Sequence, residues 1–532
     1  MILKFISTPG DFLLMFPENF LWGVSEAGFQ FEMGDPLGKN VDPNTDWFKW
    51  VHDPVNVGRK IVSGDLPENG VNYWELYGSD HELAEELGMN AYRLGVEWSR
   101  IFPRDTAEAR VDVEIEEGRI VRIDFDEKAL ERLETLANMD ALNHYERIIE
   151  NLRDKGFRVI VCLNHFTLPI WIHDPIAARD TGLRSGARGW YDQKTIVEFS
   201  KYAGFLAWRL GDKVDMWATF NEPNIVAETG YFLTSTGFPP SVRMNALNAL
   251  KTFKRVLMNM IVAHARAFEA IKKFDSQRAD PDSSLPASIG VIQHVIPVMP
   301  LNPFREADSH ASRFLKNVHN NLFVEAASSG WVDKNLNMVR DGDEVEKDLK
   351  GKLDWLGVNY YTRMVAKGRT SLLAKLLMGI RGVPEIMEGY GLTCRAKDVS
   401  RDGRPTSDFG WELYPEGLVE TLLEMSRYGR PMFITENGVA DSEDRLRPRY
   451  IVEHLRVLEE IVNVKRVDVR GYFHWALTDN YEWAQGFSMK FGLYSVILNT
   501  KERIPRKNSV ETLRRIIQNR TVGAYDSFSR QV

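Results

Sequence analysis

Eight short apolar runs recur along the chain, and stretches with helical periodicity separate them. The runs occupy residues 20–30, 90–97, 158–166, 215–221, 287–294, 354–361, 431–436 and 469–477. Most are almost continuously apolar, which is typical of parallel strands that are covered on both faces. Eight such strands alternating with helices predict an α/β fold, a (β/α)8 TIM barrel with long loop insertions.

The intervals between the runs contain both helices and insertions. Residues 140–155 and 195–211 repeat apolar positions at helical spacing. Residues 105–126 alternate apolar and charged side chains, which predicts a β-hairpin insertion. Residues 364–405 form a second insertion with a basic, apolar stretch at 372–380. We expect this stretch to form an amphipathic surface helix, to line a substrate cleft or to contact another subunit.

The barrel is predicted to span residues 16–520 as one domain. Residues 1–15 are expected to be an N-terminal extension outside the fold, and residues 521–532 a C-terminal tail. The extension is apolar but short, and no convincing small-residue cleavage site follows it, so it does not resemble a signal peptide. Because barrel-like sequence begins at Phe16, Met15 is a candidate start of the functional protein.

Composition excludes several classes of protein. The 532 residues include 67 basic and 75 acidic side chains, with a net charge of -8. Nucleic-acid binding is therefore disfavoured, because phosphate recognition needs a basic surface. The sequence contains no run of 18 apolar residues, so we expect no membrane span. Two distant cysteines, Cys162 and Cys394, make no disulfide framework, which predicts a reducing, cytoplasmic location.

Polar side chains gather where the predicted strands end. In a barrel of this type the carboxyl ends of the strands meet at one rim, where active sites lie. The polar and aromatic residues at or just after these ends are Gln30, Asn164, His165, Asn221, Glu222, Asn359, Tyr361, Glu436, Trp475, Glu482 and Trp483, and Arg93 lies within the second run. Amides, carboxylates and indoles at one rim indicate a sugar site.

Glu222 and Glu436 are the candidate catalytic pair. Two carboxylates delivered by two strand ends are what cleavage of a glycosidic bond requires. A single glutamate at a strand end is more often an ion-pair partner, and only the joint pattern favours catalysis. The sequence contains no zinc signature and no glycine-rich phosphate loop, so we expect no metal and no cofactor. Metal ligation by His165 with carboxylates is the weaker alternative.

Four motifs carry a resemblance to a known family. They are Thr219-Phe-Asn-Glu-Pro223, Gly357-Val-Asn-Tyr-Tyr361, Ile434-Thr-Glu-Asn-Gly438 and Asn480-Tyr-Glu-Trp483. With them the chain resembles glycoside hydrolase family 1, and within it the archaeal β-glycosidases and β-mannosidases. The resemblance runs from about Phe16 to about Arg515.

The resemblance implies a role for each site residue. Glu222 would be the general acid and base, and Glu436 the nucleophile of a retaining mechanism. Arg93 and Tyr361 would bracket the nucleophile. The residues that would bind the sugar are Gln30, His165, Asn221, Asn359, Trp475, Glu482 and Trp483, with Asn221 at the 2-hydroxyl and Trp475 as the platform. No metal or cofactor is implied.

Elementary electrostatics supports the same division of roles. Arg93 and the Tyr361 hydroxyl beside Glu436 are expected to favour its charged form, as a nucleophile requires. Glu222, in a desolvated position near that charge, is expected to start protonated. The retaining mechanism predicts that the two carboxyl groups lie about 5–5.5 Å apart.

The identity of the sugar is left open by the sequence. Phe166 and the stretch 500–505 resemble mannosidases, whereas 481–486 resembles glucosidases and galactosidases. We therefore expect an exo-β-glycosidase that removes terminal β-D-mannosyl or β-D-glucosyl residues, or both, with β-galactosyl as a further option. The substrates would be small β-glycosides or short oligosaccharides. The alternatives are a glycosyl-transferring enzyme and a non-catalytic sugar-binding relative.

Assembly and origin are expectations by resemblance. Archaeal relatives often form tetramers, so we expect a homo-oligomer, a tetramer or a dimer. The 27% of charged residues suits ion-pair networks and a thermophilic archaeon.

Overall fold

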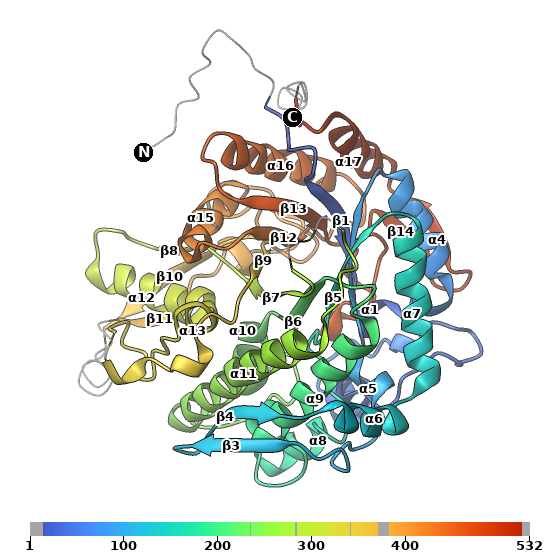
Figure 1. Ribbon diagram of the computed structural model, residues 1–532. Coiled ribbons are helices and arrows are strands. Elements are labelled where there is room, and N and C mark those ends of the chain that lie inside the picture. Colours follow the sequence, from blue (N-terminus) through green and yellow to red (C-terminus); the bar gives the residue numbers. More distant parts are fainter. Residues whose placement is uncertain are drawn as a thin grey trace.

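A closed barrel of eight parallel strands forms the centre of the molecule (Figure 1). The computed structural model describes residues 14–234, 236–281, 283, 285–340, 342–370 and 382–523. The strands, in barrel order, are β1 (Leu21–Ser25), β13 (Val469–His474), β12 (Met432–Asn437), β9 (Trp355–Asn359), β7 (Ser288–His294), β6 (Met216–Asn221), β5 (Arg158–Cys162) and β2 (Ala91–Gly95). Each coincides with one predicted run, which confirms the (β/α)8 prediction.

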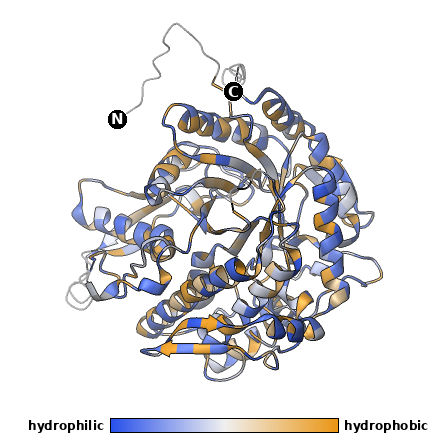
Figure 2. Cartoon of the chain, in the orientation of Figure 1, coloured by the Kyte–Doolittle hydropathy of each residue, from blue (hydrophilic) through white to orange (hydrophobic). Residues whose placement is uncertain are grey.

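Helices surround the barrel. They are α1 (Gly28–Phe31), α2 (Asp46–Val51), α3 (Pro54–Gly58), α4 (Tyr73–Glu86), α5 (Trp98–Ile101), α6 (Glu127–Leu136), α7 (Met139–Asp154), α8 (Pro175–Thr181), α9 (Gln193–Leu210), α10 (Pro223–Ile225), α11 (Ala246–Phe274), α12 (Glu306–Lys316), α13 (Leu322–Ser329), α15 (Glu416–Met425), α16 (Arg447–Asn463) and α17 (Lys507–Asn519). Both predicted helices are present, as α7 and α9. Figure 2 shows apolar and polar residues alternating along the outer helices, as expected where one face packs on the barrel.

Side chains fill the interior of the barrel. The cluster inside it consists of Ala91, Ile160, Cys162, Met216, Ala218, Ile292, Trp355, Phe433 and Phe473. A packed interior leaves no passage through the barrel. Chemistry is therefore confined to the rim above this cluster.

Five strands end earlier than their apolar runs, three of them by three residues or more. The run 20–30 contains only β1, because the chain turns into helix α1 at Gly28. Glycine is required there, since a Cβ atom would lie 2.4 Å from Cγ of Glu97. The run 158–166 leaves the strand after Cys162, and Phe166 adopts a left-handed backbone with φ of 73°. Likewise β13 stops at His474, so these rim residues lie on turns beyond the strands.

Both insertions contain strands. Strands β3 (Asp112–Glu116) and β4 (Arg119–Asp124) form the antiparallel hairpin expected within 105–126. After β9, strands β10 (Met364–Arg369) and β11 (Val383–Ile386) join β8 (Val298–Pro300) in a three-stranded sheet. A separate pair is formed by β14 (Tyr494–Ile497) and β15 (Glu502–Pro505).

Parts of the expected domain plan fall outside the described residues. These parts are the N-terminal extension as far as residue 13, the whole of the stretch 372–380, and residues 524–532. At the other limit of the barrel, Val522 is buried and its N–H donates to Oε1 of Glu459, 3.1 Å away. Packing on the barrel thus continues two residues beyond the expected limit of 520.

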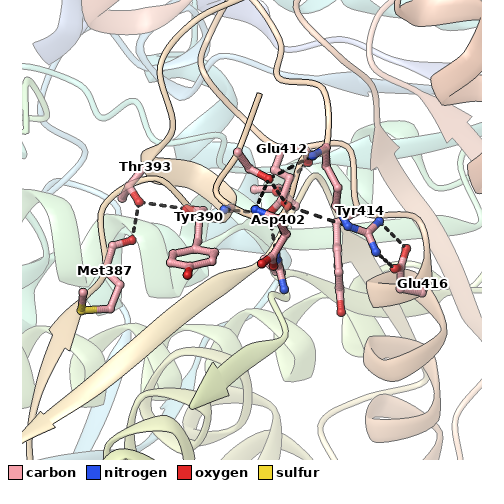
Figure 3. Close-up of polar contacts among 12 residues, drawn as sticks. Met387, Tyr390, Thr393, Asp402, Glu412, Tyr414 and Glu416 are labelled. Carbon is pink, nitrogen blue, oxygen red and sulfur yellow. Dashed lines mark hydrogen bonds and ion pairs between the residues drawn. The ribbon is translucent and has the colours of Figure 1, made fainter. Parts of the chain in front are cut away.

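The buried carboxylate of Glu412 anchors the segment that follows β9 (Figure 3). Nε and Nη2 of Arg363 donate to it over 2.8 and 3.0 Å. The Ser400 hydroxyl and the Gly391 N–H donate over 2.7 and 2.9 Å. Arg363 also lies 4.4 Å above the Tyr414 ring. The segment is thus fixed to the end of β9 by a carboxylate whose two oxygens both accept hydrogen bonds.

Removing this anchor should be costly. We expect Glu412→Ala to lower the free energy of unfolding by about 3–5 kcal/mol, because Arg363 would lose its buried partner. Glu416→Ala is the matched control, since Glu416 pairs with Arg404 at the surface and such pairs contribute about 0–1 kcal/mol. Denaturant unfolding of both variants measures the difference. Equal losses would contradict the anchoring role.

Candidate active site

Glu222 and Glu436 lie at the carboxyl ends of two barrel strands. Glu222 directly follows β6 and Glu436 is the penultimate residue of β12. Their exposed fractions are 7% and 3%. Glu222 has a left-handed backbone, with φ of 49° and ψ of 57°, and its N–H donates to the Ile292 carbonyl over 2.7 Å. Such a conformation costs free energy in a residue other than glycine and is common at functional sites.

Each oxygen of Glu436 has its own donor. Nη1 of Arg93 lies 2.6 Å from Oε1, and the Tyr361 hydroxyl lies 2.7 Å from Oε2. Burial disfavours the charge of Arg93, but Glu436, with a smaller contribution from Cys162, raises the pKa of Arg93 overall. Burial and then Glu436 raise the pKa of Tyr361 well above its usual value, so its hydroxyl keeps its proton and donates. The carboxyl group is thereby held in one orientation.

Glu222 has a different environment. Among the described residues, its carboxyl group accepts a hydrogen bond only from Nδ2 of Asn359, 2.7 Å from Oε1. Burial raises the pKa of Glu222 to about 8, and the neighbouring Glu436 is the second cause. At neutral pH this carboxyl group is therefore protonated, as a general acid must be.

A short chain of amides joins the two acids. Oδ1 of Asn221 accepts from Nη2 of Arg93 over 2.8 Å and from Nδ2 of Asn359 over 3.0 Å. The Thr435 hydroxyl donates to Oδ1 of Asn359 over 2.8 Å and fixes that amide in turn. Arg93 thus contacts Glu436, and Asn359 contacts Glu222, through one shared acceptor on Asn221.

His165 is a neutral ring held between Arg93 and Asn221. Its Nδ1 lies 3.1 Å from Nη2 of Arg93, and a guanidinium group can only donate. Burial and Arg93 lower the pKa of His165 well below its usual value. Nδ2 of Asn221, which is also a donor, lies 3.2 Å from Nε2, so both ring nitrogens face donors and these contacts do not assign the ring proton to either one. The ring lies nearly parallel to Trp475 and Trp483, with centroids 5.9 and 5.7 Å away.

Gln30 and Glu482 form a hydrogen-bonded pair in the site. Nε2 of Gln30 donates to Oε2 of Glu482 over 3.3 Å, while Oε1 of Gln30 is buried without a partner in the described protein. Burial and then Glu436 raise the pKa of Glu482 to about 8. Trp483 stacks on Phe29 at 5.9 Å. A buried acceptor without a donor is costly, which indicates that a ligand supplies the donor.

The contacts above bring all the predicted site residues together at one rim. Sequence reasoning placed Glu97 near the end of a strand but gave it no role; it accepts from the Phe29 N–H over 2.9 Å and from the Thr167 hydroxyl over 2.7 Å. Burial raises its pKa to about 8. Glu97 ties the helix that carries Gln30 to the turn that follows His165. A charged residue closing the run 90–97 was the available signal.

His294 is a second residue to which sequence reasoning gave no role. It is the last residue of β7, the one barrel strand to which no site residue was assigned. Its ring lies 6.3 Å from that of Tyr361. An imidazole at a strand end was again the signal.

Neither a metal centre nor a membrane span is evident among the described residues. No group of three His, Cys, Asp or Glu side chains is placed there to hold a metal ion. Nδ1 of His165 faces the positive Arg93, which disfavours a cation at that nitrogen. No helix in the described ranges is long and apolar enough to cross a bilayer.

Comparison with known proteins places the chain in a family. The sequence model of "Glycosyl hydrolase family 1" matches residues 14–113 and 133–522. A beta-galactosidase of Pyrococcus woesei is 49% identical over 514 residues, covering 96% of this chain and 98% of the relative. The solved β-glycosidase of the hyperthermophile Thermosphaera aggregans superposes with a TM-score of 0.87 at 41% identity, covering 97% of this chain and 100% of that one. A β-glucosidase mutant derived from a hyperthermophilic tetrameric structure gives 0.83 at 41% identity, covering 97% and 98%. The chain therefore belongs to glycosyl hydrolase family 1 and is a glycoside hydrolase.

Proposed function

We propose that this protein is a retaining exo-β-glycosidase in which Glu436 is the nucleophile and Glu222 the general acid and base. The observation that carries the proposal is the contrast between the two carboxyl groups. Arg93 and Tyr361 donate to Glu436, whereas burial raises the pKa of Glu222 to about 8. Two carboxyl groups with different environments are the basis of an acid and nucleophile pair.

The proposed reaction has two steps. Glu222 gives its proton to the glycosidic oxygen while Glu436 attacks the anomeric carbon, the C–O bond breaks and a glycosyl ester forms. The ester removes the charge of Glu436, which is the second cause of the raised pKa of Glu222. Glu222 then takes a proton from water, which attacks the same carbon and releases the sugar and Glu436. The carboxyl separation of about 5–5.5 Å stays a prediction.

The glycone is proposed to bind between Gln30, Glu482 and the two tryptophans. Oε1 of Gln30 supplies an acceptor for its hydroxyl groups, and the ring of His165 lies nearly parallel to both tryptophans. We propose β-D-glucosyl, β-D-galactosyl and β-D-mannosyl residues as glycones. The Pyrococcus woesei relative is a beta-galactosidase, which favours galactosides as substrates. The resemblance of Phe166 to mannosidases favours mannosides.

A panel of aryl glycosides combined with NMR tests this proposal. We expect release of p-nitrophenol from the β-D-glucoside, β-D-galactoside and β-D-mannoside, but none from the α-anomers. The first sugar detected by ¹H NMR should be the β-anomer, because two displacements at one carbon restore its configuration. A first product with the α configuration would overturn the retaining mechanism.

Two further proposals concern the state of the protein. One similar solved structure is a β-glucosidase mutant derived from a tetrameric structure, which supports a homo-oligomer for this protein. Light scattering tests this proposal. A reducing location is supported by two free thiols, Cys162 buried and Cys394 partly buried. A glycosyl-transferring enzyme would use the same ester. The measured ratio of transfer to hydrolysis distinguishes such an enzyme from a hydrolase.

A further inference from the structure

His294, His319 and Glu228 form a hydrogen-bonded row next to the proposed general acid. Nδ1 of His319 lies 2.9 and 3.1 Å from the two oxygens of Glu228. Nδ1 of His294 lies 2.8 Å from Nε2 of His319. Glu228 and His319 come from two π-helical turns, η3 (Val226–Gly230) and η4 (Asn317–Asn321). Such turns are rare and frequently occur at functional sites.

The chemistry of the row fixes each ring proton. A carboxylate can only accept, so Nδ1 of His319 donates to Glu228. The amino group of Asn224 lies 3.3 Å from Nε2 of His319, which makes that nitrogen an acceptor. Nδ1 of His294 must then donate to it. Burial and His319 lower the pKa of His294 well below its usual value, so its ring carries this one proton only.

Nε2 of His294 is therefore an acceptor without a partner. No described residue hydrogen-bonds to it, and it is not among the buried atoms that lack partners. The residue itself is partly exposed. The row thus presents a fixed lone pair at the surface of the rim.

The register of the barrel places this lone pair beside Glu222. His294 is paired with Asn359 in the ladder between β7 and β9. Paired residues of parallel strands project from the same face, and Ile292, two residues earlier, packs inside the barrel. The side chain of Asn359 reaches Glu222, so that of His294 lies over the same rim.

The strand order separates His294 from the sugar pocket. Strand β7 is adjacent to β6, which delivers Glu222, and lies four strands from β1, which precedes Gln30. A general acid faces the leaving group, so the leaving group lies toward β6 and β7. The ring of Tyr361 packs near the rings of His294 and Trp411, with centroids 6.3 and 5.2 Å away. An acceptor beside aromatic rings suits a hydroxylated ring such as a second sugar.

We propose that His294, oriented by His319 and Glu228, accepts a hydrogen bond from a hydroxyl of a sugar leaving group or of an incoming sugar acceptor. The inference rests on the proposed function and extends it to the second sugar. In transfer, the acceptor oxygen attacks the anomeric carbon of the Glu436 ester. The bond to Glu436 breaks, and the proton of the attacking hydroxyl goes to Glu222. A different hydroxyl of the acceptor donates to Nε2 of His294.

Partitioning of the glycosyl ester tests the proposal. A p-nitrophenyl β-glycoside forms the ester, and either methyl β-D-glucoside or methanol is added as acceptor. The ratio of transfer to hydrolysis is measured for each within one variant, so equal activity of the variants is not needed. His294→Phe keeps a ring beside Tyr361 but removes the acceptor atom. We expect the ratio of transfer to hydrolysis with methyl β-D-glucoside to fall about 3- to 10-fold relative to the same ratio with methanol. A fall of this size corresponds to the loss of one hydrogen bond.

Two further variants separate binding from stability. Glu228→Gln keeps the size of the side chain and weakens the orientation of the row, so we expect a smaller fall in the same direction. His144→Phe, on the outer helix α7, is the control and should leave both ratios unchanged.

The row has a simpler alternative role, in which it only ties η3 to η4. In that case His294→Phe lowers the melting temperature while the sugar and methanol ratios keep their proportion, and the inference is overturned. Wild-type protein that releases no p-nitrophenol would instead overturn the proposed function, and the inference with it.

Discussion

Glu436→Gly should lower kcat for p-nitrophenyl β-glycosides by about 10⁴-fold or more, because no other group can form the glycosyl ester. Arg93 and Tyr361 would remain and would still point at the vacated position. Steady-state release of p-nitrophenol at saturating substrate measures the loss. Residual activity near the wild-type value would remove Glu436 from the mechanism.

Added formate should partly restore turnover in this variant. Its carboxylate fits the space left by the side chain and meets the same two donors, 2.6 and 2.7 Å from the former oxygens. Glu436→Gln is the matched control, since its amide fills the space and excludes formate. If formate restores the activity of Glu436→Gly but not of Glu436→Gln, the glycine variant contains an empty anion site at this position. Equal behaviour of the two variants contradicts that explanation.

The sequence carried enough information for the barrel and for much of its rim. Parallel strands buried on both faces leave continuous apolar runs, so all eight strands were predicted. Their carboxyl ends must share a rim, which brought the polar residues together, and the resemblance to glycoside hydrolase family 1 then implied the neighbours of Glu436. Arg93 and Tyr361, 268 residues apart in sequence, do contact the same carboxyl group.

The ends of strands were harder to predict, because burial continues beyond the last ladder hydrogen bond. Gln30 belongs to a helical turn that Gly28 permits by its close approach to Glu97. The sequence was silent about the partners of His294, since Glu228 and His319 lie on helical turns far along the chain in either direction. The raised pKa of Glu222 was predicted in direction, and its value depends on burial that only the structure gives.

Glu222→Ala should act selectively on substrates with poor leaving groups. A sugar or alkyl aglycone needs a proton as its bond breaks, so kcat/KM should fall by about 10²–10⁴-fold. A dinitrophenolate leaves without protonation, and kcat/KM for that glycoside should change far less. The two substrates share a glycone, so the comparison cancels any loss of sugar binding. Equal losses for both would contradict the role of Glu222 as acid.

The pH dependence of kcat/KM gives an independent test of the same residue. The pKa of Glu222 is raised to about 8, so its acid form is present at neutral pH and is lost as pH rises through about 8. For a poor leaving group, kcat/KM should therefore fall on the alkaline side, and Glu222→Ala should lack this fall. Glu482 has a pKa raised to a similar value and is the competing explanation. Glu482→Gln separates them: an alkaline fall that disappears there belongs to Glu482, and one that persists there but is absent from Glu222→Ala belongs to Glu222.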